Sequence, residues 1–411
     1  MKHKILIILA GSLLFFGAIQ LNSCRKDFTL KEIDNLKTDS MHLSGAIAVP
    51  LVNTELTLGK YLPPNDSSLW AEVDAQDLIH LKMYYKDLHV ITMKDIFVSE
   101  IFSIPQGTLV SKDSVIVKSD TSKMKVYDRM FSGNLFFRDP KIRFYISNNI
   151  PLATFFRLDT LDFYNEDNEL LSNNEHVSYD IEAPMNEGET INTTILVDKS
   201  VMPILPTAFS PIPKKVSFQF SAGSHTDQII PFDVDGTEEM HVDAEIDLPL
   251  DARLDTILLA DTIPLPDNWM ADNIIQLKEA NFRVLFSNGF PIDAYSQIYF
   301  ADTLVTGEIG NNIDSIFTEH TYGWHLESAG IDAAGNTTTP NETAPINITL
   351  DQTRLKNLVD SHASKIVVAA YVNTKNVANG DYVRLRGNDK ISVKIGVMAK
   401  YEGDTNDVPN N

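Results

Sequence analysis

Strict alternation of apolar and polar side chains is the feature that most narrows the folds open to this chain. The run HVDAEIDLPL, residues 241–250, has an aliphatic residue at every second position and acidic residues between them. The run KISVKIGVMAKY, residues 390–401, repeats the pattern. A β-strand turns successive side chains to opposite faces, so each run predicts a strand with one buried and one wet face. Helical spacing is scarce, and we expect an all-β protein.

An internal duplication is the second constraint. The segment KIRFYISNNIP, residues 141–151, returns as NFRVLFSNGFP, residues 281–291, with arginine, serine, asparagine and proline at matching positions. Two further blocks follow in the same order: INTTILVDKSVMPIL at 191–205 matches INITLDQTRLKNL at 346–358, and KKVSFQFS at 214–221 matches SKIVVAAYV at 364–372. In the middle block a strand precedes Asp198 or Asp351, which can cap a short helix. The order of the three blocks indicates two similar modules.

We therefore expect two tandem antiparallel β-sandwich modules of immunoglobulin-like form, each with one short helix, behind an N-terminal lipoprotein signal. The expected boundaries are a signal peptide at 1–23, a tether at 24–42, an N-terminal β region with the first module at 43–225, a second module at 228–402, and a disordered tail at 403–411.

Cys24 is the only cysteine in the chain and directly follows the basic head MKHK and the apolar run ILIILAGSLLFFGAIQL. A basic head, an apolar middle and a small-residue end are typical of a secretory signal. The tetrapeptide LNSC, residues 21–24, resembles the bacterial lipobox, in which the cysteine is acylated. The alternative is an uncleaved anchor helix, although the apolar run is short of the roughly 20 residues that span a bilayer. Acylation would leave no thiol for a disulfide, for catalysis or for zinc.

Four segments together resemble a family of Bacteroidota lipoproteins of unknown function: SGAIAVPLVNTELTLGKYL, DLPLDARLDTILLADTIPLP, NFRVLFSNGFPIDAYSQIYFAD and AGIDAAGNTTTP. The strand–Asn-x-x-Pro–strand element is also similar to the late-embryogenesis-abundant type 2 (LEA2-like) sandwich. The resemblance implies a lipid-anchored tandem β-sandwich protein at the outer membrane, on its periplasmic or its cell-surface face. It supplies no catalytic residues.

The charge and the motifs bear on function. A net charge of −22 repels phosphate backbones, so we expect no nucleic-acid partner. The chain has no Gly-x-Ser-x-Gly elbow, no His-Glu-x-x-His, no phosphate-binding glycine loop and no dinucleotide fingerprint. The closest histidines, His320 and His325, are five residues apart, and a strand would point them to opposite faces. We expect neither an enzyme nor a cofactor.

Three sets of residues are candidates for ligand contact or modification. Asp233, Asp235 and Glu238 offer oxygens for calcium, although such turns are also ordinary hairpin linkers. Tryptophans near turns are candidates for stacking on sugar rings, against the commoner buried role; they are Trp70, Trp269 and Trp324. A recurring Asp–Ser/Thr–aliphatic triplet resembles the O-glycosylation acceptor of Bacteroidota; the acceptors would be Ser40, Ser114, Thr160, Thr256, Thr262, Thr303 and Ser315.

From these features we expect a non-catalytic cell-envelope lipoprotein that acts as a binding or scaffold component at the outer membrane. Its lipid would contact the membrane, and its partner would be an envelope protein or a glycan. One alternative is a surface glycan-binding lipoprotein associated with a nutrient transporter. Another is an envelope hydrolase, which would need two carboxylates about 5–9 Å apart.

Overall fold

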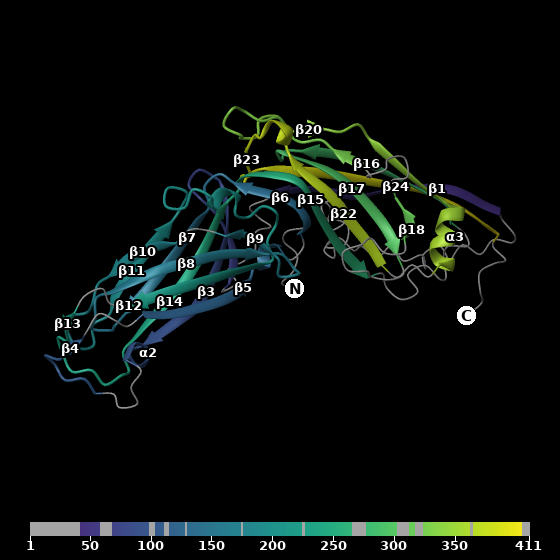
Figure 1. The fold of residues 1–411 in the computed structure, drawn as a ribbon. Helices are drawn as coiled ribbons and strands as arrows, with labels where there is room; N and C mark the ends of the chain where they lie inside the picture. The colour runs from purple at the N-terminus through teal and green to yellow at the C-terminus, as the bar shows by residue number, and fades with distance from the viewer. Residues whose placement is uncertain are drawn as a thin grey trace.

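The computed structural model describes residues 42–57, 68–97, 103–110, 115–127, 130–173, 176–223, 227–264, 277–301, 312–316, 324–361 and 365–404. These residues are mostly β-strands in several antiparallel sheets, and helix is minimal (Figure 1). The all-β fold class is thereby confirmed. The expected signal peptide, Cys24 and nearly all of the tether lie outside the described residues. None of the helices within them is long and apolar enough to cross a membrane.

Lobe 1 is a sandwich of two sheets, in the orders β11–β7–β14–β3–β2 and β10–β8–β12–β5, with β9 on β8. A ladder of β4 and β13 lies with helix α2 at the end remote from lobe 2 (Figure 1). The bounds are β2 Leu69–Val73, β3 Ile79–Thr92, α2 Met93–Phe97, β4 Leu109–Val110, β5 Val115–Lys123, η4 Lys125–Tyr127, β7 Lys141–Asn148, β8 Thr154–Tyr164, β9 Leu170–Asn173, β10 Val177–Ile181, β11 Ile191–Val197, η5 Leu205–Thr207, β12 Lys215–Gly223, β13 Gln228–Ile229 and β14 Glu239–Pro249.

Lobe 2 is a second sandwich. One sheet has the order β1–β24–β16, with β20 and β21 on β16, and the other has the order β18–β17–β22–β15, with β19 on β17 and with β6 and β23 on β15. The bounds are β1 His42–Thr57, β6 Met130–Phe137, β15 Asp251–Pro264, β16 Leu277–Asn288, β17 Ile292–Ala301, β18 Asn312–Ser315, β19 Trp324–Leu326, β20 Asn341–Glu342, β21 Ile346–Asp351, α3 Gln352–Asp360, β22 Lys365–Thr374, η7 Val377–Asn379, β23 Val383–Arg384 and β24 Lys390–Asp404.

The duplicated sequence blocks occupy equivalent places in the two lobes. The repeat at 141–151 contains β7, and the repeat at 281–291 covers most of β16. In lobe 1 the pairings β11–β7–β14–β3 and β10–β8–β12–β5 are matched in lobe 2 by β21–β16–β24–β1 and β19–β17–β22–β15. The matching strands therefore build two sandwiches of the same pairing order, as the duplication predicts.

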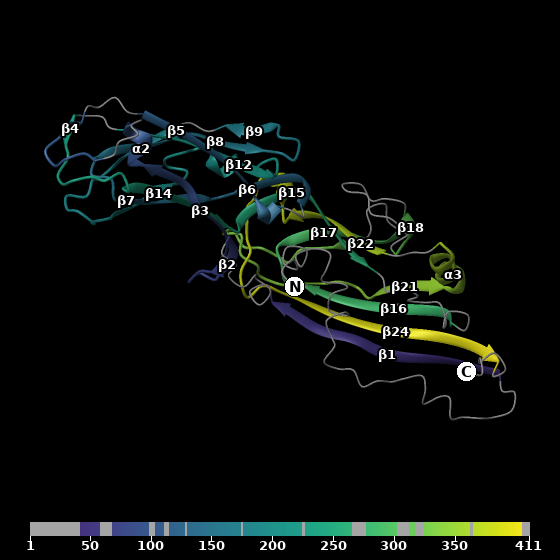
Figure 2. The same ribbon diagram turned by 90° about the horizontal axis from the view of Figure 1, so that it is seen from below.

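The lobes differ from the expected modules in where the chain is divided. β14 was expected in the second module, but it pairs with β3 and β7 of lobe 1. β1 was expected in the first module, but it pairs along its length with β24 of lobe 2 (Figure 2). Each lobe thus needs one strand from beyond the expected boundary, because β1 takes in lobe 2 the place that β3 takes in lobe 1. Lobe 1 is inserted between β1 and β15 of lobe 2, and β6 leaves this insertion to pair with β15.

The short helices follow the sequence prediction in part. In lobe 2 the Asp351 Oδ1 accepts the Arg354 N–H at 2.8 Å and so caps α3, as expected. In lobe 1 the Asp198 Oδ1 accepts the Ser200 N–H at 2.8 Å, but the turn leads only to the single 3₁₀ turn η5. At the C-terminus β24 runs to Asp404, two residues into the expected tail, and 405–411 lie outside the described residues.

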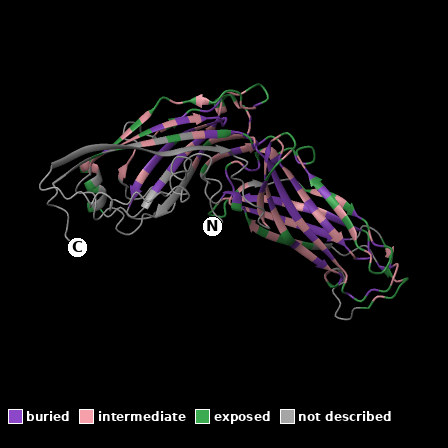
Figure 3. Ribbon diagram, turned by 180° about the vertical axis from the view of Figure 1, so that it is seen from behind, coloured by how far each residue is buried: buried purple, intermediate pink, exposed green. Residues whose placement is uncertain are grey.

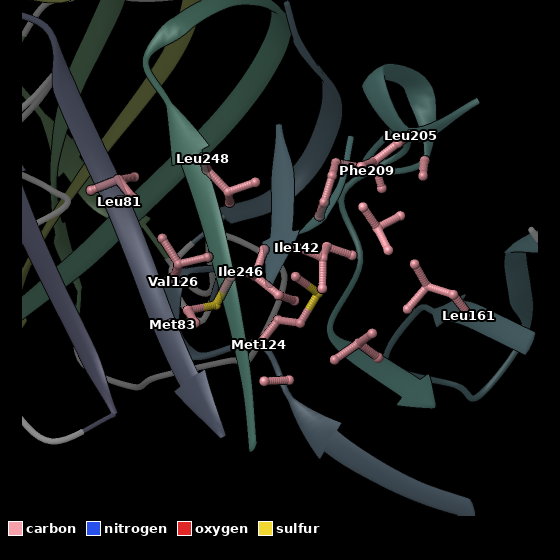
Figure 4. Packing of buried hydrophobic residues seen from close by; sticks show 14 of the residues in the cluster. Leu81, Met83, Met124, Val126, Ile142, Leu161, Leu205, Phe209, Ile246 and Leu248 are labelled. Atoms are coloured by element: carbon pink, nitrogen blue, oxygen red, sulfur yellow. The ribbon is translucent and has the colours of Figure 1, made fainter. Parts of the chain in front are cut away.

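The core of lobe 1 is dense between its two sheets (Figure 4). Phe144 of β7 has its ring centroid 5.4 Å from that of Phe220 of β12 and 5.8 Å from that of Phe156 of β8. Because β7 belongs to one sheet and β8 and β12 to the other, these rings join the two layers. Burial of each ring stabilises the fold by about 1.5–3 kcal/mol.

Hydrogen bonds between backbones fix the junction of the lobes. Leu250, the single residue between β14 and β15, donates its N–H to the Ile79 carbonyl at 2.7 Å. Its own carbonyl accepts the Leu385 N–H at 2.9 Å, and Ile79 in turn donates to the Leu385 carbonyl at 3.1 Å. These three residues come from three separated parts of the chain, so the two lobes are held together by more than a linker.

Candidate functional site

The outer face of the β7–β14–β3–β2 sheet of lobe 1 carries a continuous set of charged and tyrosine side chains, here called the charged ladder. Its strands alternate between buried and more exposed residues (Figure 3). Cross-strand register brings the polar positions together, since Asp247 lies opposite Lys82 and Glu245 opposite Arg143. The charged ladder consists of Glu72, Asp74, His80, Lys82, Tyr84, Arg143, Tyr145, Asp243, Glu245 and Asp247.

His80 lies between two carboxylates. Its Nδ1 is 2.7 Å from the Asp247 Oδ1, and its Nε2 is 3.3 Å from the Asp74 Oδ2. Burial disfavours the charged imidazole, but the hydrogen bonds and charges of Asp247 and Asp74 outweigh it, and the pKa of His80 is raised. The imidazole therefore ties the turn after β2 to β14, and both of its nitrogens are engaged.

Arg143 bridges the two acids that sequence alternation placed on the polar face of β14. Its Nη1 donates to the Glu245 Oε1 at 2.6 Å and to the Asp247 Oδ2 at 3.1 Å. Asp247 is only 3% exposed. Burial alone would raise the pKa of Asp247, but the hydrogen bond and charge of His80, with Arg143 and Lys82, hold it below its ordinary value. Asp247 is therefore an anion held by the Arg143 guanidinium, the Lys82 ammonium and the His80 imidazole.

The ladder continues along the same strands. The Tyr84 hydroxyl donates to Asp243, and the Lys82 ammonium pairs with Glu72. The Tyr84 and Tyr145 rings lie 6.4 Å apart between centroids. Burial and the neighbouring Asp243 carboxylate raise the pKa of Tyr84, so the phenol remains a donor at neutral pH. The ladder is a preformed polar surface in which each carboxylate has a side-chain partner.

This arrangement suits recognition better than hydrolysis. An acid catalyst must hold a proton at working pH, but the pKa of Asp247 is lowered. Glu245 and Asp247 also bind one guanidinium, whereas glycoside hydrolysis places its two carboxyl groups on either side of the scissile bond. One hollow of about 350 Å³ lies in lobe 2, and another of about 180 Å³ is lined by Tyr84 but by none of the charged residues of the ladder.

Sequence analysis missed the basic half of this surface. His80, Lys82 and Tyr84 alternate with the buried Ile79, Leu81 and Met83 in the run IHLKMYY, so their shared face was readable from the sequence. Their partners were not, because pairing with β14 joins residues more than 150 positions apart.

The calcium candidates already accept backbone hydrogen bonds, Asp235 and Glu238 within their own loop and Asp233 from the separate segment that contains Gln106. The Asp233 Oδ1 accepts the Gln106 N–H at 2.8 Å, and the Asp235 Oδ1 accepts the Thr237 N–H at 2.9 Å. Glu238 accepts the Gly236 N–H at 2.9 Å. Among the described residues no group of three or more His, Cys, Asp or Glu side chains is arranged to hold a metal ion. Each of the three carboxylates therefore has a backbone N–H as its partner.

The tryptophans proposed for sugar stacking are separated. Trp324 of β19 is half-buried, with its ring centroid 4.6 Å from that of Phe286. Trp70 of β2 is also half-buried and lies opposite Lys82, so it shares the ladder face. Trp269 lies outside the described residues. His325, considered for a metal, instead stacks on Tyr295 with centroids 4.4 Å apart, and His320 lies outside the described residues.

The glycosylation candidates differ in exposure. Thr256 is exposed and has a positive φ of 54°, which is rare for a β-branched residue. Thr160 and Ser315 are half-buried on β8 and β18. Thr262 lies in β15, and its side chain is not described. Ser40, Ser114 and Thr303 lie outside the described residues.

No family model matches the chain, and no curated protein matches it. Among solved structures it is similar to a "putative secreted protein" from Parabacteroides distasonis, with 11% identity, 87% of this chain and 100% of that chain covered, and a TM-score of 0.36. Infectious bursal disease virus, Gt strain, has 4% identity, coverage of 81% and 43%, and a TM-score of 0.21. The CBM22-1-CBM22-2 tandem domain of Xyn10C from Paenibacillus barcinonensis has 8% identity, coverage of 73% and 96%, and a TM-score of 0.14.

Proposed function

We propose that this protein is a non-catalytic lipoprotein of the cell envelope, held at the outer membrane by acyl chains on Cys24, that acts as a binding or scaffold component. The direction of β1 carries the proposal. His42 pairs with Asp404 at the end of lobe 2 remote from lobe 1, and Thr57 pairs with Lys390 close to the junction (Figure 2). A tether leading from Cys24 into β1 would attach the remote end of lobe 2 to the bilayer and leave lobe 1 outermost.

The dimensions suit such an arm. β1 has 16 residues and spans about 50 Å, which sets the length of lobe 2 along the arm. The junction around Leu250 keeps lobe 1 beyond lobe 2 through its hydrogen bonds to Ile79 and Leu385. Two or more acyl chains hold a protein stably on a bilayer. The charged ladder on lobe 1 would then be presented at a distance from the membrane as a fixed polar face.

Glycan binding is the second candidate, and the position of Trp70 favours it. This ring shares the ladder face with Tyr84 and Tyr145, and sugar-binding surfaces combine aromatic rings with polar groups. A glycan array probed with the full chain and with Trp70→Ala distinguishes the two functions. A scaffold gives no sugar signal, whereas a glycan binder gives one that Trp70→Ala reduces.

The orientation is tested with acylated protein in vesicles that carry an energy-transfer acceptor in their headgroups. A donor dye is placed at Glu187→Cys in lobe 1 or at Lys400→Cys in lobe 2, because Cys24 is consumed by the lipid and leaves no competing thiol. We expect strong transfer from position 400 and weak transfer from position 187. Equal transfer from the two positions would contradict the proposed arm, and a Cys24→Ser chain that stays on the vesicles would contradict the anchor.

A further inference from the structure

The end of lobe 1 remote from lobe 2 presents an exposed apolar pair. Leu109 of β4 lies directly opposite Ile229 of β13, and each is 66% exposed. Their neighbours Val110 and Ile230 are buried at 6% and 0%. The β4–β13 strand pair therefore buries Val110 and the following Ile230 in the core and leaves Leu109 and Ile229 exposed.

The duplication shows what covers the matching position in lobe 2. There β23 pairs with the start of β15, as β13 pairs with β4, so the Asp251–Arg384 pair corresponds to the Leu109–Ile229 pair. Asp251 is only 7% exposed and accepts the Arg138 Nε at 2.8 Å and the Arg384 Nε at 3.2 Å. This end of lobe 2 is covered by lobe 1. Within this chain, the end of one β-sandwich therefore serves as the contact surface for the other.

Lobe 1 has replaced the ion pair by two aliphatic side chains and surrounded them with acids. The five described segments at this end, 93–97, 103–110, 149–153, 182–190 and 227–238, contain eight acidic residues and one lysine, Lys94 of α2. The opposite end of lobe 1 already contacts lobe 2, so it is not available to another protein. An apolar centre inside an acidic rim is complementary to an apolar socket with a basic rim.

We propose that this end of lobe 1 docks head-to-tail onto the end of a β-sandwich in a different envelope protein, whose apolar socket receives Leu109 and Ile229 and whose rim is rich in lysine and arginine. The inference deepens the proposed scaffold function and rests on it, since that function places lobe 1 outermost. The docking repeats between two proteins the contact that lobe 2 makes with lobe 1.

The test uses the full acylated chain in its native membranes with a photo-crosslinking amino acid at position 109 or 229. Position 170 is the matched control, because Leu170 is 52% exposed but lies on β9 at the other end of lobe 1. Position 84 samples the charged ladder. We expect positions 109 and 229 to label one and the same protein, position 170 not to label it, and the labelled peptide to map to a lysine- or arginine-rich end of a β-sandwich.

The labelled protein is then purified and its affinity is measured. Leu109→Asp with Ile229→Asp should weaken binding by about tenfold or more, while Leu170→Asp stays within about twofold. Binding should also weaken as NaCl rises from about 0.05 to 0.5 M. An unchanged melting temperature shows that the variants fold. Labelling of a second copy of this chain or of lipid alone overturns the docking site; labelling only from position 84 overturns it but keeps the scaffold function; and no labelling from any position overturns both.

Discussion

Asn148 and Asn288 lie 140 positions apart and share two of their three hydrogen bonds, one from the N–H two residues on and one to the carbonyl of a distant glutamate. Asn148 accepts the Ile150 N–H at its Oδ1 and donates to the carbonyls of Ile150 and Glu182. Asn288 accepts the Phe290 N–H and donates to the carbonyls of Ile292 and Glu327. The asparagines are 0% and 1% exposed. Each therefore ties the end of one inner strand to a distant loop of its own lobe.

Asn148→Ala and Asn288→Ala should each destabilise one lobe by about 2–4 kcal/mol, because buried backbone groups lose their partners. Denaturant unfolding checks this with tryptophan fluorescence, Trp70 reporting lobe 1 and Trp324 reporting lobe 2 in a Trp269→Phe background. Asn192→Ala, at an exposed position of β11, is the control and should change stability by less than about 0.5 kcal/mol. If either variant lowered the stability of both lobes equally, the two asparagines would not have lobe-specific roles.

Stability of lobe 1 should depend on pH through His80 and Asp247. The pKa of His80 is raised by folding, so its contribution is complete below about pH 6.5 and is lost as pH rises through the folded pKa. The pKa of Asp247 is lowered, so its contribution is lost as pH falls through its folded pKa. Denaturation midpoints from pH 5.5 to 8.5 should fall with rising pH. The fall should flatten in His80→Gln and persist in His176→Gln, whose ring is exposed.

Asp251→Asn should loosen the two lobes from each other. The carboxylate is buried between Arg138 and Arg384, and its loss leaves both guanidinium groups without their common partner. In calorimetry, we expect the unfolding transitions of the two lobes to lie further apart in temperature in this variant than in the parent chain. The junction should weaken by about 1–3 kcal/mol. Asp381→Asn, at an exposed position, should leave the trace unchanged; a shift there as large as that of Asp251→Asn would mean that the junction is not the cause.

Removal of β1 should damage lobe 2 although the strand lies at the opposite end of the sequence. A chain that starts at residue 58 exposes the edge of β24, so the Trp324 transition should fall to lower denaturant or the protein should associate through the bare edge. The Trp70 transition should remain. A chain that starts at residue 42 is the control. Loss of the lobe 1 transition instead would contradict the assignment of β1.

Among the described O-glycosylation candidates, Thr256 should be modified before Thr160 or Ser315, because a transferase needs an exposed hydroxyl. The Thr256 Oγ1 lies 2.9 Å from the Asp255 Oδ1 at the surface of β15. Intact mass of protein from the native host should fall by one glycan in Thr256→Ala and be unchanged in Thr160→Ala. If the parent protein has the mass of the acylated polypeptide alone, it carries no glycan and the prediction is wrong.

Much of the fold follows from the sequence because its determinants are local. The alternation in residues 241–250 is found as buried Val242, Ala244 and Ile246 on one face and Asp243 and Asp247 in the ladder on the other. The repeated Ser-Asn-x-x-Pro element predicts the ends of two strands, and in the structure β7 and β16 end at its asparagines, Asn148 and Asn288. These features depend on spacing and turn chemistry within a few residues.

The choice of strand partners could not be predicted in the same way. The apolar pattern of residues 42–57 suits a strand of either sandwich, and only the pairing with β24, far along the chain, decides between them. The ladder was hidden for the same reason, since His80 and Asp247 meet through a strand pairing that closes a long loop. The sequence thus specified the strands, but not which lobe each completes.

The pairing of His42 with Asp404 determines the order in which the two lobes can fold during synthesis. Every strand of lobe 1 has been translated once residue 249 is made, so this lobe can close early. β1 is made before all of them, yet its partner β24 is translated after every other described strand of both lobes. At about 5–20 residues per second, the opening strand waits many seconds with its hydrogen-bonding groups uncovered. A chaperone that shields residues 42–57 during this interval would protect the whole molecule from aggregation.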